Sequence, residues 1–155
     1  MFIAKKDDLI ILARDTQEEL ENALQFMNYD SIEETDVEYK LFDGVYLTTQ
    51  EVEAKERERI NMLSLTAADV ERAIYKAKGL DFEDILEQVQ TLKQVQGDNL
   101  AIDIKALKIE LKANNFYRGN PYVIKIGALL GFGSEQLDYL FEHGYFEEQE
   151  VADNA

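Results

Sequence analysis

The feature that most constrains the fold is a stretch with two apolar sides, residues 102–114. At the helical angle of about 100° per residue, Ile104, Leu107 and Leu111 fall on one side. The opposite side carries four more apolar residues: Ile102, Ala106, Ile109 and Ala113. A cationic edge of three residues separates the two sides: Lys105, Lys108 and Lys112. Since a surface helix needs only one apolar stripe, the stretch predicts the central helix of a bundle, covered from both sides.

Residues 1–48 carry the signals of a small α+β unit. Residues 2–5 and 9–13 predict two strands joined by a tight turn. Thr16 and Glu19 have capping-box spacing, ahead of a helical stripe over residues 20–27. Asp43-Gly44 lies between two runs rich in aromatic and β-branched residues, which is a strong hairpin signal. We therefore expect two hairpins and a helix in this unit.

The rest of the chain predicts helices. Residues 49–65 are densely charged, which favours a mostly solvated connector helix. Residues 66–144 hold several apolar helical stripes with capping residues between them, and residues 145–155 form an acidic, flexible tail. The predicted fold class is α+β, mainly α: a small N-terminal two-hairpin-plus-helix unit, joined by the charged helix to a C-terminal helical bundle.

The residue types available exclude several kinds of chemistry. The chain has no cysteine, which rules out disulfides and thiolate zinc sites, and its one histidine, His143, rules out multi-histidine metal sites. Nucleophile-elbow and phosphate-loop motifs do not occur in it. We expect no enzymatic activity, no cofactor and no metal. With no apolar run near the roughly 20 residues of a membrane span, we expect a soluble, intracellular protein without a secretion signal.

Charge is strongly acidic and unevenly spread. The formal net charge is −16, from 32 acidic and 16 basic residues, which disfavours nucleic acid and anionic membranes as partners. The first 48 residues hold twelve acids and four bases, a local −8, whereas residues 105–125 hold five bases and one acid, a local +4. These two regions can attract each other within one chain or between chains. A homo-oligomer therefore remains open.

The most distinctive local segment is residues 115–122, where three aromatic residues surround an arginine beside the lysine edge. Tyrosine and arginine are enriched at interface hot spots. The candidate partner-binding residues are accordingly Tyr117, Arg118, Tyr122, Lys105, Lys108 and Lys112. In the structural alternative, the aromatic rings pack over one end of the bundle and Arg118 pairs with an acidic residue of the same chain. We expect Phe116 to be structural and Arg118 to be exposed for a carboxylate on another chain.

Residues 124–141 have the outline of a helix-turn-helix, with Ser134 as the expected cap of the second helix. A DNA reader presents polar or basic residues from that helix. This one presents acids, including Glu135, Asp138 and Glu142, which phosphates repel. We therefore predict no binding to duplex DNA.

Several strings resemble short, largely uncharacterised proteins of tailed phages and prophages of Gram-positive bacteria. They include Phe-Asp-Gly-Val-Tyr-Leu-Thr, Leu-Thr-Ala-Ala-Asp-Val-Glu-Arg-Ala and Asn-Phe-Tyr-Arg-Gly-Asn-Pro, and the similarity runs from about residue 10 to residue 141. The resemblance implies a phage context, with genes in or beside the tail-structure and lysis region. It implies no biochemical activity and carries over no catalytic residue.

Together these observations predict a non-enzymatic interaction protein that binds another phage protein in tail structure or assembly. Its expected location is the bacterial host cytoplasm or the virion. The alternative is an acidic inhibitor that mimics nucleic acid and occupies a basic groove on a host defence protein. Such a mimic needs carboxylates at phosphate-like spacing on one face, whereas an assembly protein needs an apolar or aromatic patch.

Overall fold

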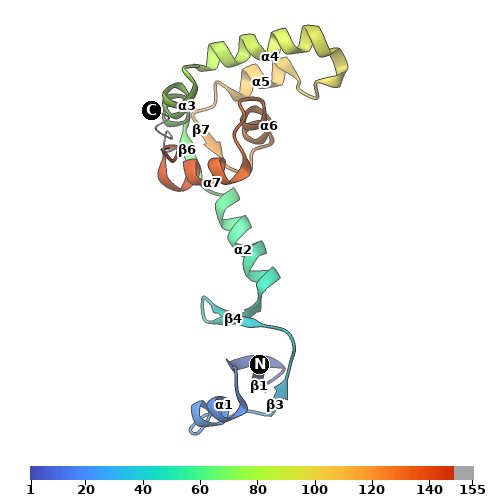
Figure 1. The fold of residues 1–155 in the computed structure, drawn as a ribbon, viewed down its shortest axis with the longest axis vertical. Coiled ribbons are helices and arrows are strands. Elements are labelled where there is room, and N and C mark those ends of the chain that lie inside the picture. Colours follow the sequence, from blue (N-terminus) through green and yellow to red (C-terminus); the bar gives the residue numbers. More distant parts are fainter. Residues whose placement is uncertain (149–155) are drawn as a thin grey trace, which may run out of the picture. The chain divides into compact units, whose positions relative to one another are not determined.

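The computed structural model describes residues 1–148 and confirms an α+β, mainly α fold (Figure 1). The chain divides into two compact units, Met1–Arg57 and Glu58–Ala155, which are described separately below. Of the expected acidic tail, residues 149–155 lie outside the described part. Within residues 1–148, no helix is both long enough and apolar enough to span a bilayer.

The N-terminal unit is built on a three-stranded antiparallel sheet. Its strands β1 (Phe2–Lys6), β2 (Leu9–Arg14) and β3 (Ser31–Glu34) lie in the order β2-β1-β3. The β1–β2 turn places Asp7 and Asp8 in the left-handed region, with φ of 51° and 64°. Carboxylates occupy half of β3, which begins an acidic run whose alternating polarity is typical of a solvated strand face. One of them, Glu33, lies 2.8 Å from the Lys5 ammonium, and this hydrogen bond raises the pKa of Lys5.

Helix α1 (Gln17–Ala23) covers one face of that sheet. Leu20 and Leu24 pack on Ala4 and form the centre of a small core. Thr16 caps the helix by accepting from the Glu19 N–H at 3.2 Å, as its spacing predicts. The expected stripe out to residue 27 is too long. The helix ends at Ala23 and Leu24, which leaves Met27 45% exposed.

A second hairpin completes the unit. Strands β4 (Tyr39–Phe42) and β5 (Val45–Thr48) pair antiparallel around Asp43 and Gly44, both with positive φ, so the predicted hairpin is confirmed. Helix α2 (Thr49–Asn61) follows directly. Thr48 and Glu51 form its reciprocal capping box, with N···O distances of 3.1 and 3.2 Å. No residue of α2 is buried, which confirms a solvated helix.

The C-terminal unit combines helices with a short two-stranded ribbon. Strand β6 (Ser64–Thr66) pairs antiparallel with β7 (Asn115–Tyr117), and the helices α3 (Ala67–Lys78), α4 (Phe82–Gln96), α5 (Ile104–Glu110), α6 (Pro121–Leu129) and α7 (Ser134–His143) complete the unit together with a 3-10 turn at Gly97–Asn99. Thr66, Asp81 and Asn120 cap helices α3, α4 and α6 through their side chains. The capping role predicted for Ser134 is wrong: Gly133 is the N-cap, and its N–H donates to Gln136 Oε1 at 2.9 Å.

One apolar core holds these elements together. It includes Ile74 from α3, Ile85 and Val89 from α4, Leu107 from α5 and Leu140 from α7. Phe116 enters from β7 and meets Phe82 edge-on, with ring centroids 5.8 Å apart. Phe116 is therefore structural, as expected. Phe146, within the expected tail, also packs on this core and stacks on Phe132 at 4.2 Å.

The prediction of a central helix covered from both sides is wrong. Asp103 accepts from the N–H groups of Lys105 and Ala106, so α5 begins only at Ile104 and Ile102 precedes it in a different backbone conformation. Leu107 is fully buried, but Ile109 is 71% exposed. Helix α5 buries one side only, against the core and beside α4 (Figure 1).

Candidate functional site

The candidate segment 115–122 begins as a β-strand, which fixes the directions of its side chains. In the β6–β7 ladder, Ser64 faces Tyr117 and Leu65 faces Phe116. Because side chains alternate along a strand, Phe116 points into the core and Tyr117 points out, 57% exposed. The backbone pairing continues beyond the ladder, since the Arg118 N–H donates to the Leu63 carbonyl at 2.9 Å. Arg118 is therefore held on the inner side, like Phe116.

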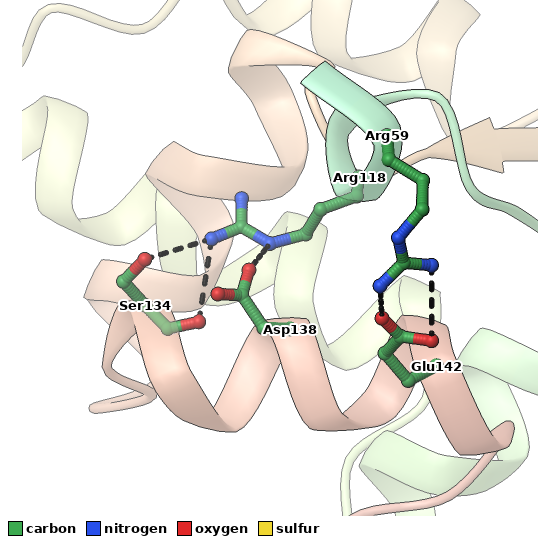
Figure 2. Close-up of polar contacts among 5 residues, drawn as sticks. All are labelled: Arg59, Arg118, Ser134, Asp138 and Glu142. Atoms are coloured by element: carbon green, nitrogen blue, oxygen red, sulfur yellow. Dashed lines mark hydrogen bonds and ion pairs between the residues drawn. The ribbon is translucent and has the colours of Figure 1, made fainter. Parts of the chain in front are cut away.

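Arg118 is buried, with 4% of its surface exposed. Its Nε donates to Asp138 Oδ1 at 2.8 Å, and its Nη2 donates to Ser134 Oγ at 3.0 Å and to the Ser134 carbonyl at 3.3 Å (Figure 2). A guanidinium presents several donors in a fixed fork, so one side chain holds three acceptors of a single helix. The prediction that Arg118 is exposed for a partner is wrong.

A second arginine binds the same helix. Arg59, near the end of α2, donates to the carboxylate of Glu142, and one of these contacts measures 3.5 Å (Figure 2). Ser134, Asp138 and Glu142 are spaced four residues apart, so they lie along one side of α7. Two arginines thus bind the acidic side of α7 that a DNA-reading helix would turn outward. The helix-turn-helix outline is here a packing arrangement.

Close backbone packing at α6 supports that conclusion. A Cβ atom added to Gly127 would lie only 2.7 Å from Leu137 Cδ1, so α6 approaches α7 where the former has no side chain. Residues 127–137 therefore turn tightly to place one helix on the other. Gly127 thus serves helix packing, whereas Gly131 supplies the positive φ of the turn.

The lysine edge of the candidate site stays exposed, as Tyr117 does. Lys105, Lys108, Ile109 and Lys112 are all exposed and are spaced at intervals of three and four residues, so they share the outer side of α5 and its last turn. We call these four residues the α5 face. Among residues 1–148, no carboxylate oxygen forms an ion pair with any of the three ammonium groups. Sequence reasoning found the lysines but placed Ile109 in the core.

Tyr122 is only partly available. Its ring packs against the core, and Lys125 Nζ lies 5.7 Å from the ring centroid. The Lys125 ammonium also donates to the Ala101 carbonyl at 3.1 Å. Lys125 therefore connects α6 to the loop before α5, and this contact helps to hold α5 in place.

The core of the unit contains an apolar cavity of about 50 Å³. Its walls include the rings of Phe82, Phe116 and Phe141, and Phe146 from the end of the described chain. Glu110 is the one acidic side chain in the wall, and its Oε2 accepts from the Asn120 amide at 3.1 Å. An apolar lining of this kind holds no ordered water by hydrogen bonding. The cavity is a packing gap, and it brings no reactive groups together.

Within residues 1–148, no group of three or more histidine or carboxylate side chains is placed to hold a metal ion. Comparison of the chain with protein-family models, with curated proteins and with solved structures gave no match.

Proposed function

We propose that this protein is a non-enzymatic interaction protein of phage origin that binds another phage protein in tail structure or assembly. The observation that carries the proposal is the α5 face. It offers three lysines without a described acidic partner around an isoleucine that is 71% exposed. The best-fitting partner surface is therefore rich in carboxylates and has an apolar centre.

The other cations of the C-terminal unit give this observation its weight. Four of them, Arg59, Arg72, Lys76 and Arg118, pair with a carboxylate of the same unit. The other three have a different partner: Lys78 lies over the Phe132 ring, and Lys93 and Lys125 donate to backbone carbonyls. Three neighbouring lysines that lack such pairs leave a local positive field, which steers an acidic partner and favours one docking orientation.

The phage context rests on the resemblance of the strings quoted above. The role in tail structure or assembly therefore depends on that resemblance, whereas the binding of a partner depends on the α5 face. The two parts of the proposal are separable by experiment, because binding can be lost by substitution of surface lysines alone.

The test is a capture experiment in cells carrying the phage. The tagged chain and its K105E/K108E/K112E variant are compared, and the retained proteins are identified by mass spectrometry. We expect a phage-encoded protein to be retained by the unchanged chain and lost by the variant. The matched control is K40E/K55E/K76E, which makes the same change in net charge at exposed lysines on three other elements.

Two outcomes would overturn the proposal. One is a host nuclease or other defence protein as the main partner, which would favour the acidic mimic instead. The other is retention that the K105E/K108E/K112E variant leaves unchanged. The ion pairs of Glu33, Asp138 and Glu142 count against the mimic, because a carboxylate neutralised by a neighbouring cation is a poor substitute for a phosphate.

A further inference from the structure

A second unusual surface lies on the N-terminal unit, where the β1–β2 turn meets the loop between α1 and β3. Four apolar side chains of these segments are exposed: Leu9 at 70%, Phe26 at 95%, Met27 at 45% and Tyr29 at 44%. A phenylalanine that is almost wholly solvated buries none of its apolar area within its own unit. Exposed apolar residues gathered in this way mark interaction sites.

Hydrogen bonds hold the two segments together. The Asp30 N–H donates to the Lys5 carbonyl at 2.7 Å, and the Asp7 N–H donates to Asp30 Oδ2 at 2.8 Å. These bonds bring Asp30, which follows Tyr29, to the turn at Asp7 and Asp8, which precedes Leu9. We call the four apolar residues and the three aspartates the N-terminal patch. Its surroundings are acidic as well, since Met1–Arg57 holds 15 acids and 6 bases, a formal net charge of −9.

The N-terminal patch and the α5 face are complementary in both respects that matter for docking. Each has an exposed apolar centre. One is bordered by carboxylates and the other by ammonium groups. We infer that the N-terminal patch of one copy of this protein binds the α5 face of a second copy. This inference goes beyond the proposed function, because it gives the α5 face a second occupant, another copy of this chain, besides another phage protein.

The type of symmetry follows from the two surfaces being different. An interface between unlike patches is heterologous, so each copy keeps one free patch and one free face after the first contact. Association therefore continues head to tail unless the geometry closes a ring. The size of the oligomers in a sample should therefore increase with protein concentration and should exceed that of a dimer.

Ionic strength decides how visible the association is. Two chains of charge −16 repel each other at long range, whereas the patch and the face attract each other at contact. At about 0.15 M salt the Debye length is about 8 Å, so the long-range repulsion is screened and the contact attraction largely survives. At about 1 M salt the length is about 3 Å, which weakens the contact as well. Small patches place the contact among weak interfaces, below about 1,200 Å² of buried surface.

The test uses analytical ultracentrifugation of the full chain and two variants at physiological salt, up to millimolar protein. F26S/M27S removes apolar area from the N-terminal patch, and K105E/K108E/K112E reverses the charge of the α5 face. Both change only exposed side chains, so the fold should be retained, which circular dichroism checks. We expect the average mass of the unchanged chain to rise with concentration, and each variant alone to stay at the 17.8 kDa of one chain.

Mixing the two variants gives the decisive result. In an equimolar mixture, the intact α5 face of F26S/M27S meets the intact N-terminal patch of K105E/K108E/K112E. We expect a 1:1 dimer of twice the chain mass that does not grow further, because both remaining surfaces are disabled. K40E/K55E/K76E should associate like the unchanged chain.

Three results would overturn the inference. The first is an unchanged chain that is monomeric throughout the concentration range. The second is association of the lysine variant alone, which would mean that the N-terminal patch pairs with itself. The third is a mixture that forms no dimer. None of these results touches the proposed function. That proposal fails if a host defence protein is the main partner, or if capture of a phage protein is insensitive to the α5 lysines.

Discussion

Arg118 and the α5 face were predicted as one cationic surface, yet they have opposite roles. Arg118 lies in β-paired backbone, and this pairing directs its side chain at α7, where Ser134 and Asp138 accept all three of its described hydrogen bonds. Lys105, Lys108 and Lys112 lie on the solvent side of a helix that packs only through its other side. The difference teaches that the secondary structure in which a basic residue lies decides whether its side chain is buried in the fold or exposed to a partner. Its neighbours in sequence decide this less.

The largest expected effect separates the two sides of α5. Leu107→Asp places an unpaired carboxylate in a fully buried position and should destabilise the protein by roughly 4 kcal/mol or more. Ile109→Asp, the same type of change two residues away, should cost less than about 0.5 kcal/mol, because Ile109 faces water. Urea unfolding followed by circular dichroism measures both. Similar losses of stability at the two positions would support the original prediction that both sides of the helix are buried.

The next effect concerns the buried arginine. Arg118→Ala removes the guanidinium that binds Asp138 in a site where the two side chains are only 5% and 23% exposed, so we expect a loss of about 2–3 kcal/mol. Arg118→Lys keeps the charge but not the fork of donors, so its loss of stability should be smaller than that of Arg118→Ala. In a double-mutant cycle, Arg118→Ala with Asp138→Ala should cost clearly less than the sum of the single changes. Additive losses would show that the ion pair contributes nothing.

A smaller effect is expected where the same helix meets an exposed arginine. The Arg59 and Glu142 side chains are 47% and 31% exposed, so water and salt screen their attraction. Arg59→Ala should therefore cost only about 0.2–1 kcal/mol, and the loss should shrink at high salt. A loss as large as that of Arg118→Ala would mean that solvent exposure does not determine how much each arginine contributes to stability.

The smallest expected effect is at the α5 face. Replacing Lys105, Lys108 and Lys112 by alanine removes no described ion pair and introduces a better helix former, so the melting temperature should hardly change. Partner capture, by contrast, should be lost. A clear fall in the melting temperature would place these lysines with Arg118 as structural residues.

The sequence predicted what depends on local chemistry. Thr16 marks a helix start through its own side chain, and Asp43-Gly44 marks a turn through its backbone preference. The error at Arg118 concerns a feature set from a distance. Its burial follows from the position of α7, sixteen to twenty residues further on.

The limits of α5 show the same point within one helix. The 3.6-residue period extends smoothly over residues 102–114, but the Asp103 side chain ends the helix before Ile102 by bonding two N–H groups. Ile109 then lies on the side away from the core with no element to cover it. Periodicity identifies which residues share a side of a helix, but it does not reveal whether a neighbour packs there.

The small core of the N-terminal unit has a thermodynamic consequence. Apart from Ile3, Leu20 and Leu24, its buried apolar side chains are alanines, so burial of apolar area supplies little stabilising free energy to Met1–Arg57. Such a unit responds strongly to mass action: a partner that binds only its folded form, at a concentration of 100 times Kd, adds about 2.7 kcal/mol. If the N-terminal patch binds the α5 face, association covers the apolar area of Phe26 that folding leaves in water, and the folded fraction of the unit then depends on protein concentration.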